Sequence, residues 1–385
     1  MSEWKEVRLG NVCETNKSQY SIKENWHHFK YLDTGNITKG QIDEIQPFDS
    51  FERLPSRARR KVFDGDIIYS SVRPNQEHYG YISNPPEELL VSTGFVVISA
   101  NKDIVNPIFL YNFLTQPEIT KYLQAIGEQS VCTYPAIKPS DIENLVINIP
   151  SLETQEKIAS ILSALDDKIA VNRRICENLE AQAQALFKHW FIDFAPFKDG
   201  KFVESELGMI PEGWRVGTLG EIAEFKRGKT ITKENTKEGN IPVVAGGLEP
   251  AYYHNESNTS SRVITISGSG ANAGFTRMYY VPVWASDCSF VDSASTSFLH
   301  TAYCYLLSNK KKVDALQWGA AQPHVYAKDI NKLPLTIAPF EVLIKFEELV
   351  VRMFDSMEIY EKENLRLSTL RDTLLPKLMS GQIKV

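Results

Sequence analysis

The segment DIENLVINIPSLETQEKI, which starts at Asp141, returns as DINKLPLTIAPFEVLIKF, which starts at Asp329. Both copies open with Asp-Ile, alternate apolar and polar residues up to a proline, and then change to helical spacing. The copies lie 188 residues apart (329 − 141). Self-similarity at a fixed offset is the mark of a duplicated unit, so this segment predicts that the chain contains one architecture twice.

A second pair of segments marks the beginning of each copy. WKEVRLGNVCE starts at Trp4 and WRVGTLGEIAE starts at Trp214, an offset of 210 residues (214 − 4). Because the offset falls from 210 to 188, the second copy must lose 22 residues (210 − 188) between these two landmarks. The pattern predicts a constant frame around a variable interior.

The interior of each copy contains signals for both strands and helices. Short β-branched and aromatic runs at residues 62–72 and 90–100 predict strands, and residues 262–270 and 283–293 are their counterparts. Helical stretches follow at residues 106–124 and 301–317. Each domain is therefore expected to mix α and β structure.

Two long helices give the clearest periodicity. Apolar residues recur in steps of four and three, which is typical of a coiled coil. Because a domain separates the helices in sequence, the chain must return, and an antiparallel pair lets it do so. Asn172 and Asn364 occupy positions in this seam, where they either fix the register or lie at a poorly buried edge. The predicted seam residues are Ile158, Leu162, Leu165, Ile169, Leu179, Leu186, Phe346, Val350, Met353, Met357, Leu367, Leu374 and Leu378.

These signals define a fold class and domain boundaries. We expect an α+β protein with two mixed α/β domains, separated by two long helices that form an antiparallel coiled coil, and with a pseudo-twofold internal repeat. The expected segments are a first domain at 1–150, a first helix at 151–194, a linker at 195–212, a second domain at 213–338 and a second helix at 339–385.

Composition narrows the class of protein. No apolar run approaches the roughly 20 residues of a membrane span, and the N-terminus lacks the apolar stretch of a signal peptide. A cytoplasmic protein without membrane contact is therefore expected. The five cysteines are scattered without a CxxC pair, which predicts reduced thiols and no metal site.

Charge is negative overall but uneven along the chain. The net charge of −6 counts against a nucleic-acid binder, since phosphates favour basic surfaces. Two basic runs nevertheless lie in the domains, and each can equally be an ordinary solvated surface. The runs are Arg53, Arg57, Arg59, Arg60 and Lys61, and Lys226, Arg227, Lys229 and Lys233.

The junction between the copies carries the most specific motif. ALFKHWFIDFAPFKDGKFVESELGMIPEGW, at residues 185–214, resembles the central junction of the specificity subunits of type I restriction-modification systems. LRDTLLPKLMSGQI, at residues 370–383, is similar to the end of the C-terminal helix in that family. The resemblance covers the whole chain in architecture, with two target-recognition domains and two separating helices.

The resemblance implies a reader of DNA without catalytic activity. In this family each domain reads one half of a split double-stranded DNA target, and the helices set the spacer and dock two methyltransferase subunits that modify adenines. The resemblance implies no cofactor in this chain. The partner methyltransferase would use S-adenosylmethionine, and joining restriction subunits would use ATP and Mg. Because the two domain interiors differ, the half-sites are expected to differ.

Candidate DNA contacts lie in two pairs of loops and in the two basic runs. Amide, guanidinium, imidazole and hydroxyl groups suit base edges, whereas lysine and arginine near strands suit phosphates. The loop candidates are Arg73, Asn75, Gln76, His78, Gln129, Thr133, Tyr134, Ser267, Ser269, Asn272, Arg277, Gln322, His324 and Tyr326. The phosphate candidates are Arg59, Arg60, Lys61, Lys226, Arg227 and Lys229.

Catalytic motifs are incomplete in this sequence. The Asn-Pro-Pro-Glu of residues 84–87 lacks the aromatic residue that stacks on a flipped base in amino-methyltransferases. The glycine-rich residues 268–274 lack the Gly-Lys-Ser/Thr ending of a phosphate-binding loop. No catalytic residue is predicted. The alternatives are a stand-alone DNA-modifying enzyme and a coiled-coil scaffold that does not bind DNA.

Overall fold

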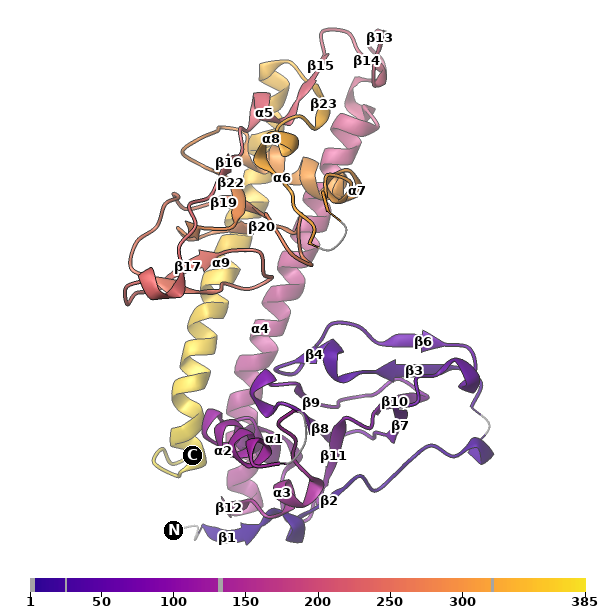
Figure 1. The fold of residues 1–385 in the computed structure, drawn as a ribbon, viewed down its shortest axis with the longest axis vertical. Coiled ribbons are helices and arrows are strands. Elements are labelled where there is room, and N and C mark those ends of the chain that lie inside the picture. Colours follow the sequence, from indigo (N-terminus) through magenta and orange to yellow (C-terminus); the bar gives the residue numbers. More distant parts are fainter. Residues whose placement is uncertain (1–3, 25, 131–133, 320–321) are drawn as a thin grey trace. The chain divides into compact units, whose positions relative to one another are not determined.

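The computed structural model describes residues 4–24, 26–130, 134–319 and 322–385 (Figure 1). They form two compact units. Unit 1 contains the chain up to Ile169 and the segment Arg366–Val385, and unit 2 contains Ala170–Leu365. Each unit thus combines one mixed domain with part of each long helix.

Unit 1 is built on two four-stranded sheets. The first sheet has the order β2-β11-β8-β9 and the second β6-β3-β10-β7, in which β3 and β10 run parallel. The strands are β2 (Cys13–Thr15), β11 (Phe95–Ala100), β8 (Ile67–Ser70), β9 (Tyr79–Tyr81), β6 (Gln46–Phe48), β3 (Phe29–Leu32), β10 (Leu89–Ser92) and β7 (Ala58–Lys61). Two-stranded pairs join β1 (Lys5–Arg8) to β12 (Val146–Ile149) and β4 (Ile37–Thr38) to β5 (Gln41–Ile42).

Alternation along the strands assigns the faces of the first sheet. Ile68 and Phe95 pack with residues of the second sheet in one apolar cluster. Ile67 and Val96 point to the other face and pack with the helices. That helical layer contains α1 (Pro107–Leu114), α2 (Pro117–Glu128) and α3 (Pro139–Glu143). The result is a sheet–sheet–helix arrangement within unit 1.

A buried glutamine fastens the start of α1 to the first long helix. Asn106 caps α1, since its Oδ1 accepts hydrogen bonds from the backbone N–H groups of Ile108 and Phe109. Gln155, which is 1% exposed, accepts from the backbone N–H of Asn106 at 2.9 Å and donates to the carbonyl of Ile104. Burying an amide requires such partners, so this contact fixes the helix against the domain.

Unit 2 repeats these sheets in the same connectivity, which confirms the predicted duplication. Its sheets have the orders β16-β22-β19-β20 and β18-β17-β21, and β17 and β21 again run parallel. The strands are β16 (Lys226–Arg227), β22 (Cys288–Asp292), β19 (Val263–Ser267), β20 (Thr276–Tyr279), β18 (Tyr252–His254), β17 (Ile241–Val244) and β21 (Trp284–Ala285), with β15 (Arg215–Thr218) paired to β23 (Pro334–Ile337). The helices are α5 (Leu219–Ile222), α6 (Leu299–Ser308), α7 (Lys310–Asp314) and α8 (Ala327–Ile330).

Most of the predicted shortening falls before β19. From Trp4 to Ser71, just after β8, the chain advances 67 residues (71 − 4). From Trp214 to Gly268, just after β19, it advances 54 (268 − 214), so 13 of the 22 residues (67 − 54) are lost in this stretch. The described residues of unit 2 in this stretch form no counterpart to β7 or to the β4–β5 pair. The variable interior therefore lies at the edge of the second sheet.

The long helices are shorter than their expected segments. The first, α4 (Leu152–Phe187), ends in a π-helical turn over Lys188–Ile192, and the second, α9 (Phe340–Met379), ends just before Gly381 at φ +72°. The expected linker at 195–212 contains a hairpin of β13 (Phe202–Ser205) and β14 (Gly208–Pro211). The sequence missed this hairpin because its strands are short and mostly exposed.

Within each unit the two long helices run antiparallel. In unit 1, Arg371 of α9 forms an ion pair with Asp166 of α4 at 2.7 Å. In unit 2, Cys176 of α4 lies against the carbonyl of Met357. Residue numbers fall along α9 as they rise along α4, as the predicted coiled coil requires. None of the described helices combines the length and apolarity needed to cross a membrane.

Candidate nucleic-acid interface

In unit 1, two loops that are far apart in sequence are joined by backbone hydrogen bonds. The N–H of Arg73 donates to the carbonyl of Pro135 at 2.8 Å, and the N–H of Ile137 donates to the carbonyl of Ser71 at 2.8 Å. The loop after β8 therefore lies against the segment that follows α2. Two of the predicted groups of candidates are brought together by this contact.

Unit 2 has the same contact in the same register. The N–H of Gly270 donates to the carbonyl of Pro323 at 3.0 Å, and the N–H of Val325 donates to the carbonyl of Gly268 at 3.0 Å. Isolated bridges between Val72 and Ala136 and between Ser269 and His324 follow the same pairing. Arg73 and Gly270 thus occupy equivalent backbone positions.

These equivalent positions share a left-handed backbone. Arg73 has φ +49° and Gly270 has φ +81°. Glycine adopts this region without penalty, whereas a side chain is unfavourable there by roughly 1 kcal/mol. At this left-handed position unit 1 therefore has an arginine, whereas unit 2 has a glycine, which adopts the conformation without penalty.

Two further loops complete the arrangement in each unit, and sequence reasoning missed them. In unit 1 the N–H of Ser71 donates to the carbonyl of Gly94, and a Cβ on Gly94 would meet Thr34 at 2.9 Å. In unit 2 the N–H of Gly268 donates to the carbonyl of Asp287, and a Cβ on Gly246 would meet the carbonyl of Ser269 at 2.6 Å. We call these sets loop cluster 1 (residues 33–36, 71–76, 93–94 and 134–137) and loop cluster 2 (residues 245–248, 268–274, 286–287 and 322–325). The turn residues of the missed loops gave only a weak signal, since such residues occur in most loops.

Loop cluster 1 combines exposed and half-buried side chains, and Arg73 is among the half-buried ones. The guanidinium of Arg73 lies over the ring of Tyr134, 4.4 Å from its centroid, and Tyr134 is 53% exposed. Asn75 and Gln76 are exposed beside them. His78 is half-buried, and its Nδ1 lies 2.6 Å from the carbonyl of Ile37, which leaves it less available.

Two predicted contacts of unit 1 fall at or beyond the edge of loop cluster 1. Gln129 is exposed at the end of α2. Thr133 lies outside the described residues. Only some of the DNA contacts predicted for unit 1 therefore lie close to Arg73.

The candidate side chains in loop cluster 2 and on the strands beside it are more engaged with neighbouring groups. Ser267 is 4% exposed, which corrects the expectation that its hydroxyl reaches DNA. Ser269 donates to the carboxylate of Asp287. Arg277 binds the carbonyl of Leu248 at 3.1 Å and pairs with Glu249. These groups hold the loops together.

Other candidates of unit 2 remain at the surface. His324 is stacked on Tyr326 with ring centroids 6.1 Å apart, and Tyr326 is 41% exposed. Gln322 is exposed and Asn272 is half-buried. The two loop clusters share a backbone frame but carry different accessible groups.

The basic run on β7 is less available than its sequence indicated. Burial lowers the pKa of Arg60, and its Nε and Nη1 are buried without a partner among the described residues. Lys61 pairs with Glu24 at 2.8 Å, and Arg59 lies over the ring of Phe51 at 4.8 Å. These contacts leave Arg60 and Lys61 less accessible than the sequence indicated, and their role as phosphate contacts stays a prediction.

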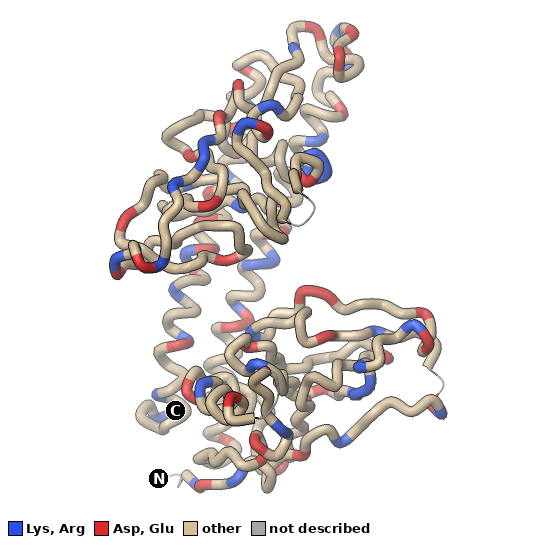
Figure 2. The backbone as a smooth tube through the Cα atoms, viewed as in Figure 1, with Lys and Arg blue, Asp and Glu red and all other residues tan. Residues whose placement is uncertain are grey.

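The second basic run lies on a different strand and is accessible. Lys226 and Arg227 are exposed on β16, the edge of the β16-β22-β19-β20 sheet, and neither forms an ion pair with a described residue. Lys229 is exposed and lies 5.9 Å from the ring centroid of Trp284. Because β7 belongs to the other type of sheet, the two basic runs are not equivalent sites. Figure 2 shows basic and acidic residues interspersed in both units.

The predicted helix seam lies on the inner side of both helices, with two levels of burial. The buried members are Ile158, Leu162, Ile169, Phe346, Val350, Met357 and Leu378. The half-buried members are Leu165, Leu179, Leu186, Met353, Leu367 and Leu374. Sequence reasoning missed Phe354, which is fully buried because it packs on His300 and Tyr303 of the second domain.

The two seam asparagines meet inside unit 2. Asn172 is 0% exposed, and its Nδ2 donates to Oδ1 of Asn364 at 2.9 Å and to Oε2 of Glu363 at 2.7 Å. The contact places them inside the helix interface and not at its edge. Paired asparagines at such positions can specify register.

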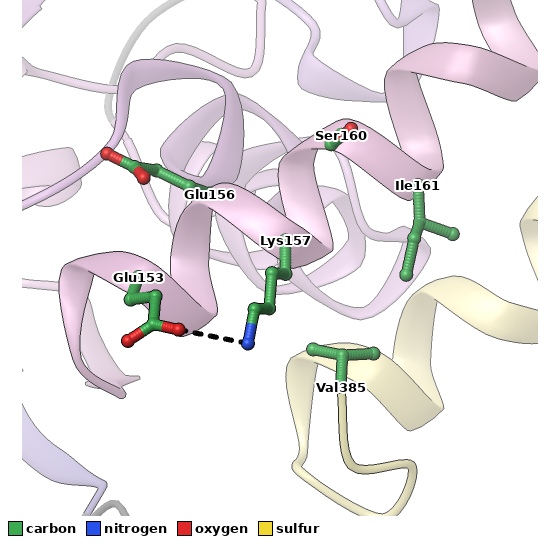
Figure 3. A pocket seen from close by; sticks show the side chains of 6 residues that line it. All are labelled: Glu153, Glu156, Lys157, Ser160, Ile161 and Val385. Carbon is green, nitrogen blue, oxygen red and sulfur yellow. Dashed lines mark ion pairs between the residues drawn. The ribbon is translucent and has the colours of Figure 1, made fainter.

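One surface hollow of about 460 Å³ lies in unit 1, bounded by the first turns of α4 and by Val385 (Figure 3). Of the charged residues that line it, Glu153 and Lys157 pair with each other at 3.0 Å, and Glu156 lies beside them. Among the described residues, no group of three or more histidines, cysteines or acids is placed to hold a metal ion.

Comparison with known proteins adds a family to this geometry. The family described as type I restriction modification DNA specificity domain matches residues 1–181 and 211–356. The specificity subunit of the type I restriction enzyme HindI of Haemophilus influenzae is 26% identical over 100% of both chains. The specificity subunit of the type I restriction enzyme MjaIX of Methanocaldococcus jannaschii is 32% identical over 98% of this chain and 92% of its own.

A solved structure shares the fold. The crystal structure of a type I restriction-modification system S subunit from M. genitalium gives a TM-score of 0.56, covering 98% of this chain and 96% of its own. At 19% sequence identity this likeness concerns the fold alone.

Proposed function

This chain belongs to the type I restriction-modification DNA specificity family, and from that premise we propose that each of its two domains reads one half of a split, asymmetric DNA target. As a member of the family it is a DNA-recognition subunit that assembles with other subunits and is itself non-catalytic. The alternatives of a stand-alone enzyme and of a scaffold without DNA binding are not favoured.

One observation carries the proposal of two different half-sites. The same backbone frame occurs in both units, but the accessible groups on it differ. Loop cluster 1 presents Arg73 and Tyr134, whereas the equivalent positions of loop cluster 2 are Gly270 and Gln322. Since base edges are discriminated by the donors and acceptors that face them, unlike side chains on one frame imply unlike sequences.

The long helices are proposed to set the spacer between the half-sites. α4 begins in unit 1 and continues without interruption into unit 2, and its 36 residues correspond to about 54 Å. We expect a continuous helix to resist bending, and the length of the helices would then set the length of the spacer. In recognition by paired modules, half-site spacing follows from such geometry.

The helices are also the proposed docking surface for two methyltransferase subunits. Val171 and Ile359 are exposed apolar residues on α4 and α9, at 48% and 65% exposure. We expect those subunits to supply S-adenosylmethionine chemistry on adenine, and restriction subunits to supply an activity that needs ATP and Mg. Cytoplasmic location is part of the same proposal, since the target is cellular DNA.

The proposal is tested by selection from random duplexes. The chain and its methyltransferase partner would be incubated with a randomised duplex pool, and bound molecules would be sequenced through several rounds. The expected result is a motif of two unlike halves with a fixed spacer. Enrichment of no bipartite motif would contradict the proposed function.

A further inference from the structure

We propose that Arg73 reads a guanine in the half-site of the first domain and that Tyr134 holds its guanidinium in position. The inference rests on the proposed function and names the base that one part of loop cluster 1 recognises. It begins from the repeat itself, which places an arginine and a glycine at one backbone position.

The backbone at Arg73 is held in an unfavourable conformation from both sides. Its N–H donates to Pro135 at 2.8 Å, and the N–H of Asn75 donates to Oε1 of Gln124 on α2 at 3.2 Å. Left-handed non-glycine residues persist when their surroundings fix them, and they gather at functional sites. Gly270 adopts the same left-handed conformation without strain. The side chain of Arg73 is therefore kept at a cost in backbone conformational energy.

The guanidinium of Arg73 is oriented but not neutralised. Its central carbon lies over the ring of Tyr134, 4.4 Å from the ring centroid, in a side chain that is half-buried. An arginine stacked on an aromatic ring keeps the N–H donors at the edge of its planar group available for hydrogen bonds. Two nearby acids are engaged elsewhere, since Glu77 pairs with Lys39 at 2.9 Å and Glu128 accepts from Gln124 at 2.9 Å. Arg73 forms no ion pair with a described residue. The structure thus presents a fixed fork of donors.

A fixed fork at this position matches guanine better than a phosphate. The O6 and N7 atoms of guanine are two acceptors side by side in the major groove, and arginine contacts both at once. The exposed neighbours Asn75 and Gln76 are neutral amides, which suit base edges. In the second domain the equivalent residue is Gly270, which has no side chain and therefore offers no donor fork at this position.

The test removes the side chain without disturbing the backbone. Arg73→Gly copies the residue that unit 2 has at this position and suits the left-handed conformation. The complex of chain and methyltransferase would be selected on random duplexes as wild type, as Arg73→Gly and as the control Arg8→Ala on strand β1. We expect Arg73→Gly to lose a guanine preference of roughly 10- to 100-fold at one position of one half-site. The other half-site, the spacer and the control motif should stay unchanged.

Two further measurements separate the base contact from other roles. Replacing that guanine with 7-deazaguanine, which lacks N7, should weaken wild-type binding roughly 10-fold and leave Arg73→Gly unaffected. Tyr134→Ala should reduce the preference without abolishing it, because it only positions the guanidinium. Equal weakening at every position would identify a phosphate contact and overturn the inference, as would an unchanged motif. Absence of any bipartite motif with the wild-type complex would instead overturn the proposed function.

Discussion

At the scale of single residues, the neighbours of a charged group decide what it can bind. Lys226 and Arg227 extend from the edge strand β16 and form no ion pair with a described residue. Lys61 has a comparable place on the edge strand β7, but Glu24 neutralises it and it packs on Trp26. An exposed cation gains from a phosphate, whereas a paired cation must first lose its partner.

The first prediction concerns the salt dependence of DNA binding. Lys226→Ala with Arg227→Ala should weaken binding to all sequences similarly. It should also reduce the slope of log affinity against log salt by about 1.8, since each phosphate contact contributes about 0.9. Lys61→Ala is the control and should leave the slope unchanged. Filter binding across a salt series gives both slopes, and equal slopes for the double variant and wild type would contradict the prediction.

A second residue-scale feature is the buried carboxylate of Glu347 on α9. It accepts hydrogen bonds from the backbone N–H groups of His300 and Thr301 at 3.0 and 2.9 Å, at the start of α6. His300 Nδ1 lies 2.7 Å from it. Burial opposes the charge, but the hydrogen bonds from His300 and Thr301 prevail and lower the pKa of Glu347. The carboxylate fastens the second domain to α9, as Gln155 fastens the first domain to α4.

The second prediction follows from that lowered pKa. Glu347→Gln should reduce the free energy of unfolding by about 1–3 kcal/mol at neutral pH, because charged hydrogen bonds are lost. A carboxyl whose pKa is lower in the folded state stabilises fully above its ordinary pKa, near 4.5, and loses this as pH falls through the folded pKa. Urea unfolding from about pH 7 downward should show the difference shrinking below that value. The exposed Glu348 provides the control Glu348→Gln, and a difference independent of pH would refute the assignment.

At the scale of elements, the helix pair combines an apolar seam with one polar contact. Asn172 and Asn364 hydrogen-bond inside unit 2, and Oδ1 of Asn172 is buried without a partner. A pair of apolar side chains would bury the same surface without leaving a polar atom unpaired. The polar pair is therefore expected to specify register at the expense of stability.

The third prediction replaces both asparagines with leucine. Asn172→Leu with Asn364→Leu should raise the free energy of unfolding by about 1 kcal/mol or more, since both polar groups are removed together. The same variant should populate more than one oligomeric or register state, visible by light scattering after size exclusion. The exposed Asn178 supplies the control Asn178→Leu. A less stable variant that stays homogeneous would contradict this role.

At the scale of the whole molecule, the chain is one architecture used twice with continuous helices shared by both units. Each unit contains one domain and a stretch of both long helices, so each domain packs on residues of α4 and of α9. The apolar clusters reflect this, because Leu378 packs with the first domain and Phe346 with the second.

The fourth prediction concerns the spacer. Removing one heptad around Asn172 and one around Asn364 keeps the phase of the seam and shortens each helix by about 10 Å. The preferred spacer should shorten by about three base pairs, with weaker binding because the half-sites also rotate about the DNA axis. Selection on random duplexes would measure both effects. An unchanged spacer would show that the helices do not set the distance.

The sequence by itself determined the repeat, its two landmarks, the antiparallel helices and the family. These depend on local patterns, namely apolar periodicity and motifs with fixed spacing, which a linear chain displays directly. The seam was predicted closely for Ile158 and Phe346. The sequence pattern missed Phe354, because that residue is buried by the second domain and not by the partner helix.

Only the tertiary structure decided which candidate residues form a site. Arg73 and Tyr134 meet because backbone hydrogen bonds join two loops, and Thr34 and Gly94 lie in two further loops of the same cluster. Lys61 pairs with Glu24, and Ser267 is buried, so both side chains are less accessible than the sequence indicated. Such contacts are set by chain topology over long sequence separations, whereas sequence patterns report on neighbours along the chain. The proposed reading surface is therefore seen only in the tertiary structure, where the loops are brought together.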